Sequence, residues 1–220
     1  MEKSIKSRLR VILLPILYVA LITAISVLAE VLFEANYYSN YYVSGSSMSP
    51  TLSGDLNDAD YGIYDKSKTA IKNVKRYQLL LTYYPNDQES VKIKRLLFKP
   101  GDTFEVVSTY NIENNCYESQ MWLFDSPTSS NHRILDFPFD TSNIKNDHYY
   151  PKTTLKENQY FLAGDNWDNS TDSFDEDVGP IDFDLLVGVV CKAEGRCKVV
   201  DGKITEKRPY KQILFNGVNY

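Results

Sequence analysis

Three short stretches of the sequence carry side chains whose types could do chemistry together. "SGSSMSPTL", residues 44–52, holds four serines, and "SVKIKRLLF", residues 90–98, holds two lysines. "AGDNWDNSTDSFDEDVGP", residues 163–180, is rich in acidic and amide side chains. Taken singly, each has an ordinary interpretation as a flexible linker, a solvated strand or an acidic turn. Taken together, they offer a nucleophile, a base and groups that could position the base.

Among these residues, a serine is the natural nucleophile and a lysine is the natural base. A serine hydroxyl is a poor nucleophile until a base removes its proton, and the chain has only two histidines. A lysine acts as a base only when neutral, and burial lowers its pKa by disfavouring the charged form. Strand alternation places Lys92, Lys94, Leu96 and Phe98 on one face. Alternation does not separate Lys92 from Lys94, and a solvated lysine is the alternative interpretation of either.

Metal or cofactor chemistry is not expected from these residues. The acidic stretch lacks the EF-hand spacing, with its glycine at the sixth position and glutamate at the twelfth. The three cysteines form no Cys-x-x-Cys pair, and neither His132 nor His148 lies close to one. "GVVCKAEGRCKVVDGKI", residues 188–204, indicates a strand, a turn and a strand, which would place Cys191 opposite Cys197. The pattern leaves open a disulfide and two free thiols.

The N-terminus predicts the element that tethers this chemistry to a membrane. Residues 11–29 carry no charge, and a transmembrane helix needs about 20 apolar residues. Residues 1–10 are basic, whereas Glu30 and Glu34 follow the apolar run. The positive-inside rule therefore predicts a single-pass protein of the cell membrane with a cytoplasmic N-terminus. A signal peptide cleaved after Ala29 is the alternative, but its apolar region would usually span only about 7–15 residues.

The rest of the chain predicts one mainly β domain outside the cytoplasm. With 220 residues, 43% of them hydrophobic, the chain can bury a sizeable core. Short β-branched or aromatic runs at 77–84, 90–98, 102–110, 158–164, 185–193 and 196–204 are typical of strands. We expect a juxtamembrane linker at 30–40 and a domain at 41–220, with an inserted polar region at about 111–151. The net charge of −5 and the absence of a basic stripe argue against nucleic-acid binding.

The three stretches together resemble the bacterial type I signal peptidases in their single-span form, which are membrane-anchored Ser-Lys endopeptidases. The motif Ser-Met-x-Pro-Thr-Leu after a glycine is matched by Gly45, Ser47, Met48, Pro50, Thr51 and Leu52. Lys-Arg followed by Pro-Gly-Asp is matched by Lys94, Arg95, Pro100, Gly101 and Asp102. The Gly-Asp-Asn-x-x-Asn-Ser-x-Asp-Ser motif is matched by Gly164, Asp165, Asn166, Asn169, Ser170, Asp172 and Ser173. The motifs occur in the family's order and cover most of the chain.

The resemblance implies a signal-peptidase-type, β-rich catalytic domain behind one transmembrane helix. It implies that Ser47 is the nucleophile, with its N–H in the oxyanion hole, and that Lys94 is the general base. Ser170 corresponds to the serine that orients the lysine, and Asp165 and Asp172 correspond to structural positions. The implied reaction removes N-terminal signal peptides from exported preproteins and needs no cofactor. The implied partners are preprotein signal peptides and membrane lipid.

Several positions depart from the family pattern. Many members have Gly-Leu where this chain has Phe98-Lys99, and Arg-Gly-Asp where it has residues 76–78, "RYQ". Trp167 and Phe174 replace two arginines, which leaves Arg95 as the expected partner of Asp172.

The second oxyanion donor also departs from the pattern. Some members use a serine hydroxyl two residues before the nucleophile, and Gly45 occupies that position. Ser44 and Ser46 are the neighbouring hydroxyls that could substitute.

These departures keep a second function open. A specialised or non-catalytic relative could assist the assembly of surface proteins such as pili, although Ser47 and Lys94 argue for catalysis. An anchored adhesion module would explain the 17 tyrosines but not three ordered motifs.

Overall fold

The computed structural model describes the backbone of residues 2–215 and the side chains of residues 13–210, and it divides into two compact units, Met1–Tyr38 and Ser39–Tyr220. The first unit is the helix α1, Glu2–Tyr37, which is apolar and long enough to cross a membrane over Leu13–Tyr37. The basic side chains of residues 1–10 lie outside the described part. Most of the segment predicted as a linker at 30–40 is helical, because no glycine or proline after Pro15 interrupts the helix before Tyr37.

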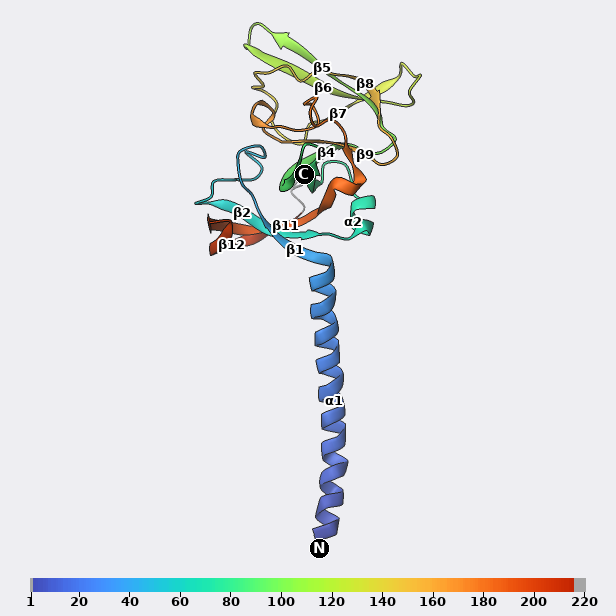
Figure 1. Cartoon of the computed structure of the whole chain (residues 1–220), viewed down its shortest axis with the longest axis vertical. Coiled ribbons are helices and arrows are strands. Elements are labelled where there is room, and N and C mark those ends of the chain that lie inside the picture. The colour runs from blue at the N-terminus through green and yellow to red at the C-terminus, as the bar shows by residue number, and fades with distance from the viewer. Residues whose placement is uncertain (1, 216–220) are drawn as a thin grey trace. The chain divides into compact units, whose positions relative to one another are not determined.

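The second unit is mainly β, as the sequence predicts, and its larger sheet has eight strands (Figure 1). The order along the sheet is β1-β2-β11-β3-β4-β9-β10, with β12 pairing to β11. The strands are β1 Tyr38–Tyr42, β2 Ala59–Asp65, β3 Leu79–Tyr84, β4 Asp87–Phe98, β9 Gln159–Ala163, β10 Ile181–Asp182, β11 Leu186–Val200 and β12 Lys203–Phe215. A short helix α2, Lys68–Lys72, follows β2, and 3-10 turns η1, Trp167–Asn169, and η2, Phe183–Leu185, flank β10.

The hairpin predicted around the last two cysteines is wrong. Cys191 and Cys197 both lie within β11, which continues through Gly195 as one strand, and both are free thiols. Six residues along a strand separate two side chains by about 20 Å, which excludes a disulfide between them. The turn lies instead at 201–202, between β11 and β12.

A second sheet carries much of the region expected as an insertion. It contains β5, Thr103–Asn111, β6, Cys116–Phe124, β7, His132–Leu135, and β8, Tyr150–Thr154, in the order β7-β6-β5-β8. Its inner side chains form one buried cluster with the ends of β4 and β9. Within that cluster the Phe98 and Phe104 rings stack with centroids 3.8 Å apart, and Phe161 meets Phe104 edge-on at 4.9 Å. This aromatic core fixes the end of β4 that carries the second motif.

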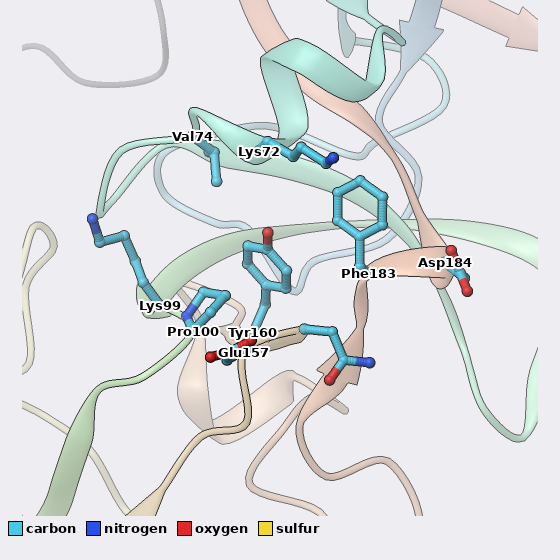
Figure 2. Close-up of a pocket in the computed structure, with 9 residues that line it drawn as sticks. Lys72, Val74, Lys99, Pro100, Glu157, Tyr160, Phe183 and Asp184 are labelled. Carbon is cyan, nitrogen blue, oxygen red and sulfur yellow. The ribbon is translucent and has the colours of Figure 1, made fainter.

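Two cavities of similar volume lie on the second unit. A groove of about 540 Å³ is lined by residues of β1, β2, β3 and β4 and by Ser44 and Ser47. The other, of about 530 Å³, lies among α2, the turn after β4, β9 and η2 (Figure 2).

Candidate active site

Ser47 lies in a folded loop between β1 and β2, not in a flexible tether. The Ser49 N–H donates to the Ser46 carbonyl at 3.0 Å, and the Leu52 N–H donates to the Met48 carbonyl at 2.9 Å. The Met48 and Leu52 side chains are buried in a core cluster. Burial of the neighbouring methionine anchors the turn, so that Ser47 remains half-buried and lines the groove.

Lys94 reaches the same groove from β4 and is almost fully buried. It pairs in register with Leu80 of β3, and only 3% of its surface is exposed. Burial lowers the pKa of the Lys94 ammonium to about 8, and the negative charge of Asp172 acts in the opposite direction. Lys92, by contrast, is half-buried and forms an ion pair with Asp87 at 2.8 Å. Packing therefore distinguishes the two lysines that alternation could not.

The third motif forms a tight loop that begins directly after β9, beside β4. The buried Asp172 carboxylate is held at Oδ2 by the Ser170 hydroxyl, at 2.6 Å, and by the Gly164 N–H, at 2.9 Å. Its Oδ1 accepts a hydrogen bond from the Phe174 N–H at 3.2 Å. Burial raises the pKa of Asp172, and the hydrogen bond from Ser170 opposes that shift. Ser170 thus contacts Asp172, whose charge acts on Lys94.

Asn166 joins the third motif to the loop that carries Ser47. Its backbone N–H donates to the Ser47 carbonyl at 3.0 Å, and its side-chain amide donates to the Ser46 carbonyl at 3.0 Å. Gly164 lies between these loops, because a methyl carbon there would be 2.4 Å from the Ser47 carbonyl oxygen and 2.3 Å from Ser170 Oγ. Asn166 was not singled out from the sequence, although its place in the third motif was the available signal.

Arg95 pairs with Asp165, so the expected pairing with Asp172 is wrong. Arg95 Nε and Nη2 meet the two Asp165 oxygens at 2.7 and 2.5 Å, and both side chains are buried. The register explains the choice of partner, since Arg95 lies opposite Ala163, two residues before Asp165. Arg95 also donates to the Tyr77 carbonyl at 2.7 Å. This bidentate pair fixes the start of the third motif to β4.

Ser47 and Lys94 thus line one groove, and the third motif contacts the Ser47 loop and β4. All three motifs lie in a mainly β unit that follows one apolar helix. The family model described as signal peptidase, peptidase S26, matches residues 13–192. The chain belongs to the signal peptidase family. A search of the curated proteins found no match. Family membership indicates a peptidase of signal-peptide processing, and with helix α1 it indicates a membrane-anchored protein.

In this member of the signal peptidase family, Gly45 has a backbone conformation that other residues rarely adopt. Its φ of +86° lies in the left-handed region, and its N–H donates to the Gly54 carbonyl at 3.1 Å. The Gly45 N–H is therefore already engaged. Of the two hydroxyls considered as substitutes, Ser44 lines the groove, whereas Ser46 does not.

Aromatic packing occupies the positions where relatives carry arginines. Trp167 and Phe174 lie with ring centroids 4.7 Å apart, and His148 packs on Trp167 at 4.8 Å. Burial lowers the pKa of His148, so its neutral form predominates in this cluster. Phe137 meets Trp167 edge-on at 5.2 Å. These rings connect the loops of the second sheet to the third motif without an ion pair.

Tyr77 is the other conspicuous departure from the family pattern. It stands where many members have glycine and has a φ of 71°, which an aromatic side chain rarely adopts. Its N–H donates to the Leu96 carbonyl at 2.7 Å, and its hydroxyl donates to the Asp136 carbonyl at 2.7 Å. These bonds, with the one from Arg95, hold the left-handed conformation in place.

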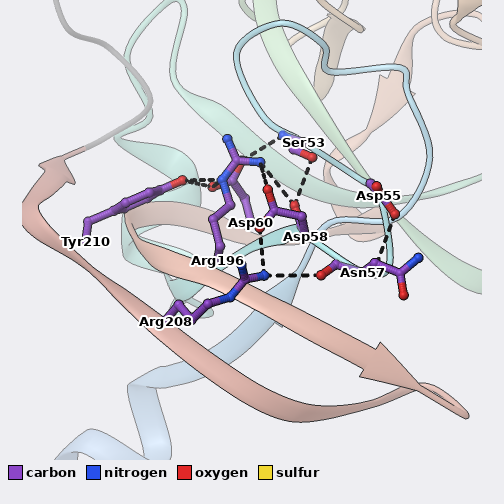
Figure 3. Close-up of polar contacts among 8 residues, drawn as sticks. All are labelled: Ser53, Asp55, Asn57, Asp58, Asp60, Arg196, Arg208 and Tyr210. Atoms are coloured by element: carbon purple, nitrogen blue, oxygen red, sulfur yellow. Dashed lines mark hydrogen bonds and ion pairs between the residues drawn. The ribbon is translucent and has the colours of Figure 1, made fainter.

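The C-terminal end of the Ser47 loop, which leads into β2, is held by the polar network in Figure 3. The buried Asp60 carboxylate accepts a hydrogen bond from the Ser53 N–H at 2.6 Å and one from the Tyr210 hydroxyl. Arg196 of β11 lies 3.3 Å from Asp60 and donates to the Tyr210 hydroxyl at 2.8 Å. Thus the sheet supports this loop at both of its ends.

Proposed function

We propose that this chain is a serine endopeptidase that cleaves signal peptides from exported preproteins with a Ser47–Lys94 dyad. The observation that carries the proposal is a buried lysine, with its pKa lowered to about 8, in the groove that Ser47 lines. A substantial fraction of Lys94 is then neutral near physiological pH and able to accept a proton. An ordinary surface lysine, with a pKa near 10.4, would be almost fully charged.

In the proposed reaction, neutral Lys94 removes the proton from the Ser47 hydroxyl as its oxygen attacks the scissile carbonyl carbon. The Lys94 ammonium then gives that proton to the leaving amine, the peptide bond breaks, and an acyl ester remains on Ser47. Neutral Lys94 next takes a proton from water, and the resulting hydroxide attacks the ester. The Ser47 oxygen leaves and takes the proton from the Lys94 ammonium, and the product acid releases its own proton to solvent and departs as a carboxylate.

Stabilisation of the oxyanion is assigned to the Ser47 N–H. Within the described residues this N–H forms no hydrogen bond, whereas the Ser47 carbonyl is held by Asn166. A free, fixed donor beside the attacking oxygen fits the requirement of an oxyanion hole. We assign the second donor to the Ser44 hydroxyl, since it lines the groove and the Gly45 N–H is engaged.

Asp172 and Ser170 are proposed as positioning residues. The Ser170 hydroxyl holds Asp172 at 2.6 Å, and the Asp172 charge favours the protonated form of Lys94. The pair therefore stabilises the ammonium that forms during acylation, while burial keeps the resting lysine a usable base.

The free edge of β4 is the proposed binding site for the extended cleavage segment. The pairing of β4 with β9 runs from Arg95 to Phe98, so that within the described strands the edge at 90–94 faces no other strand. A strand-like peptide can add its backbone hydrogen bonds to such an edge. Leu81 and Ile93 contribute apolar surface to the adjoining groove, which suits small apolar residues near the cut.

Cleavage of a preprotein-derived peptide carrying Ala-x-Ala tests the proposal, using the full-length chain in detergent micelles. Ser47→Ala and Lys94→Met should each lower kcat by at least about 10³-fold, because each removes a member of the dyad. Ser46→Ala and Lys92→Met are the matched controls and should cleave with kcat within about threefold of the wild type at the optimum pH. Cleavage retained by Ser47→Ala, or a wild type that cleaves no preprotein, would reject the dyad; the second result would favour the assembly role.

A further inference from the structure

The cavity among α2, the turn after β4, β9 and η2 is separate from the proposed active site. Its lining residues include Lys72, Lys99, Tyr160 and Phe183, none of which lines the groove of Ser47 and Lys94. Its volume of about 530 Å³ lies within the range of about 300–1,000 Å³ typical of small-ligand sites. We call it the Tyr160 pocket.

The hydroxyl of a mostly buried tyrosine points into this pocket. The Tyr160 residue is only 5% exposed, and its ring belongs to a core cluster. Figure 2 shows its hydroxyl directed into the cavity, and no group of the described residues forms a hydrogen bond with it. Burial raises the pKa of Tyr160, so the hydroxyl keeps its proton as a donor. A donor that faces the cavity and has no partner among the described residues is matched by a ligand that carries an acceptor.

Two cationic and two acidic side chains line the pocket, and the cations favour an anionic acceptor. Lys72 and Lys99 line the cavity, and among the described side chains neither forms an ion pair. Glu157 and Asp184 also line it, but Figure 2 shows Asp184 beyond Phe183 from the Tyr160 hydroxyl. Two acidic neighbours disfavour a doubly charged phosphate more than a singly charged carboxylate.

Apolar side chains form the remaining walls. Val74 and Pro100 line the cavity near Lys99, and the Phe183 ring lies 5.9 Å from the Lys72 Nζ. An aromatic or aliphatic group attached to the anion would bury its surface there.

We propose that the Tyr160 pocket binds a carboxylate carried on an aromatic or aliphatic group. The Tyr160 hydroxyl donates to the carboxylate, and Lys72 and Lys99 neutralise its charge. A free carboxylic acid and the C-terminal residue of a peptide share this chemistry. The inference does not depend on the proposed peptidase activity.

Isothermal titration calorimetry on the full-length chain in micelles tests the pocket with four probes. These are N-acetyl-phenylalanine, its amide, phenyl phosphate and the peptide N-acetyl-Ala-Ala-Phe with a free C-terminus. We expect saturable binding of the two carboxylates and at least about tenfold weaker binding of the amide and the phosphate. Tighter binding of the tripeptide than of the amino acid would indicate a peptide C-terminus, and the reverse would indicate a free acid.

Substitutions test whether the carboxylate probe binds in the Tyr160 pocket. Tyr160→Phe and Lys99→Met should each raise the Kd of N-acetyl-phenylalanine at least about fivefold. Tyr149→Phe and Lys203→Met, at exposed positions outside the pocket, should leave the Kd unchanged. Lys99 is exposed, so its variant tests the pocket even if Tyr160→Phe unfolds. The proposal is overturned by no saturable binding of either carboxylate, by equal or tighter binding of the amide or phosphate, or by an unchanged Kd in Lys99→Met.

Discussion

Among single residues, Lys94 and its environment decide whether the proposed reaction can proceed. Its pKa is lowered first by burial, is raised by Asp172, and is lowered again by the positive charge of Lys92. The three effects predict how the protonation of the base responds to pH and to substitution. They also separate Lys94 from Lys92, whose ion pair with Asp87 keeps it at the mouth of the groove.

The rate of cleavage should follow the deprotonation of Lys94. Since only the neutral amine is a base, kcat should rise about tenfold per pH unit well below the pKa and level off above about 8. Lys92→Met removes a charge that lowers the Lys94 pKa, so it should move the midpoint to higher pH. A pH–rate profile from pH 5 to 10 measures both effects. A rate that does not change between pH 6 and 9 would contradict the role of Lys94.

The Arg95–Asp165 ion pair should matter for stability more than for the chemical step. Arg95→Met leaves a buried carboxylate without its partner, which typically costs about 3–5 kcal/mol of the free energy of unfolding. Denaturant unfolding of the Ser39–Tyr220 unit would measure this loss.

A double variant serves as the control for that measurement. Arg95→Met combined with Asp165→Leu removes both charges and should recover most of the loss. A single variant as stable as the wild type would show that the pair is not the main connection between β4 and the third motif.

At the scale of elements, the adjacency of β4 and β9 brings the second and third motifs together. β9 ends at Ala163, directly opposite Arg95, and the third motif continues from there. Gly164 is the point of closest approach, with Ser47 on one side and Ser170 on the other.

Gly164→Ala should disrupt this contact. The added methyl would lie within 2.4 Å of the Ser47 carbonyl oxygen and of Ser170 Oγ, so one loop must shift. We expect a loss of about 1–3 kcal/mol in stability and at least about a tenfold lower kcat, because misplaced reacting groups cost rate steeply. Gly179→Ala is the control, because its added methyl would meet no atom within 4 Å beyond the chain neighbours. Its φ of +60° strains an alanine, so stability should fall while kcat per folded molecule stays unchanged. Equal kcat in the two variants would show that the loops do not position Ser47.

The strands were largely predictable, whereas their ends and partners were not. Short runs of β-branched and aromatic residues predicted β3, β4, β5 and β9, because such residues favour strands. The sequence predicts a turn within residues 188–204 where Gly195 lies, but Gly195 marks a close approach of strands, since a methyl carbon there would lie 2.4 Å from the Arg208 carbonyl oxygen. Sequence does not distinguish these two uses of glycine.

The candidate site, too, could be predicted from the sequence only in part. The motif spacing located Ser47, Lys94 and the third-motif loop, yet the partner of Arg95 depends on strand register, which no motif encodes. Likewise, the spacing could not show that Asn166 clamps the Ser47 loop, because that contact joins residues 120 positions apart.

At the scale of the whole molecule, helix α1 should remain part of the working protein. Its apolar side chains from Leu13 onward are exposed in the described structure, as expected for a segment that contacts lipid. Expression in a bacterial host should give a chain that stays in the membrane after alkaline carbonate extraction. Its intact mass should include residues 1–29. A chain that begins at Glu30 and is released would contradict the anchor and support the signal-peptide alternative.

Orientation follows from the same expectation. The positive-inside rule predicts a cytoplasmic N-terminus, which would place the Ser39–Tyr220 unit outside the cytoplasm. Digestion of intact spheroplasts with an external protease should therefore remove this unit.

The central claim is that Ser47 forms the covalent intermediate. The most direct test is a rapid acid quench of the full-length protein with a preprotein peptide, followed by mass spectrometry of the fragment that contains Ser47. This fragment should gain the mass of the signal-peptide product less one water, attached to Ser47. Peptide cleavage that proceeds with no adduct, or with the adduct on another residue, would contradict it.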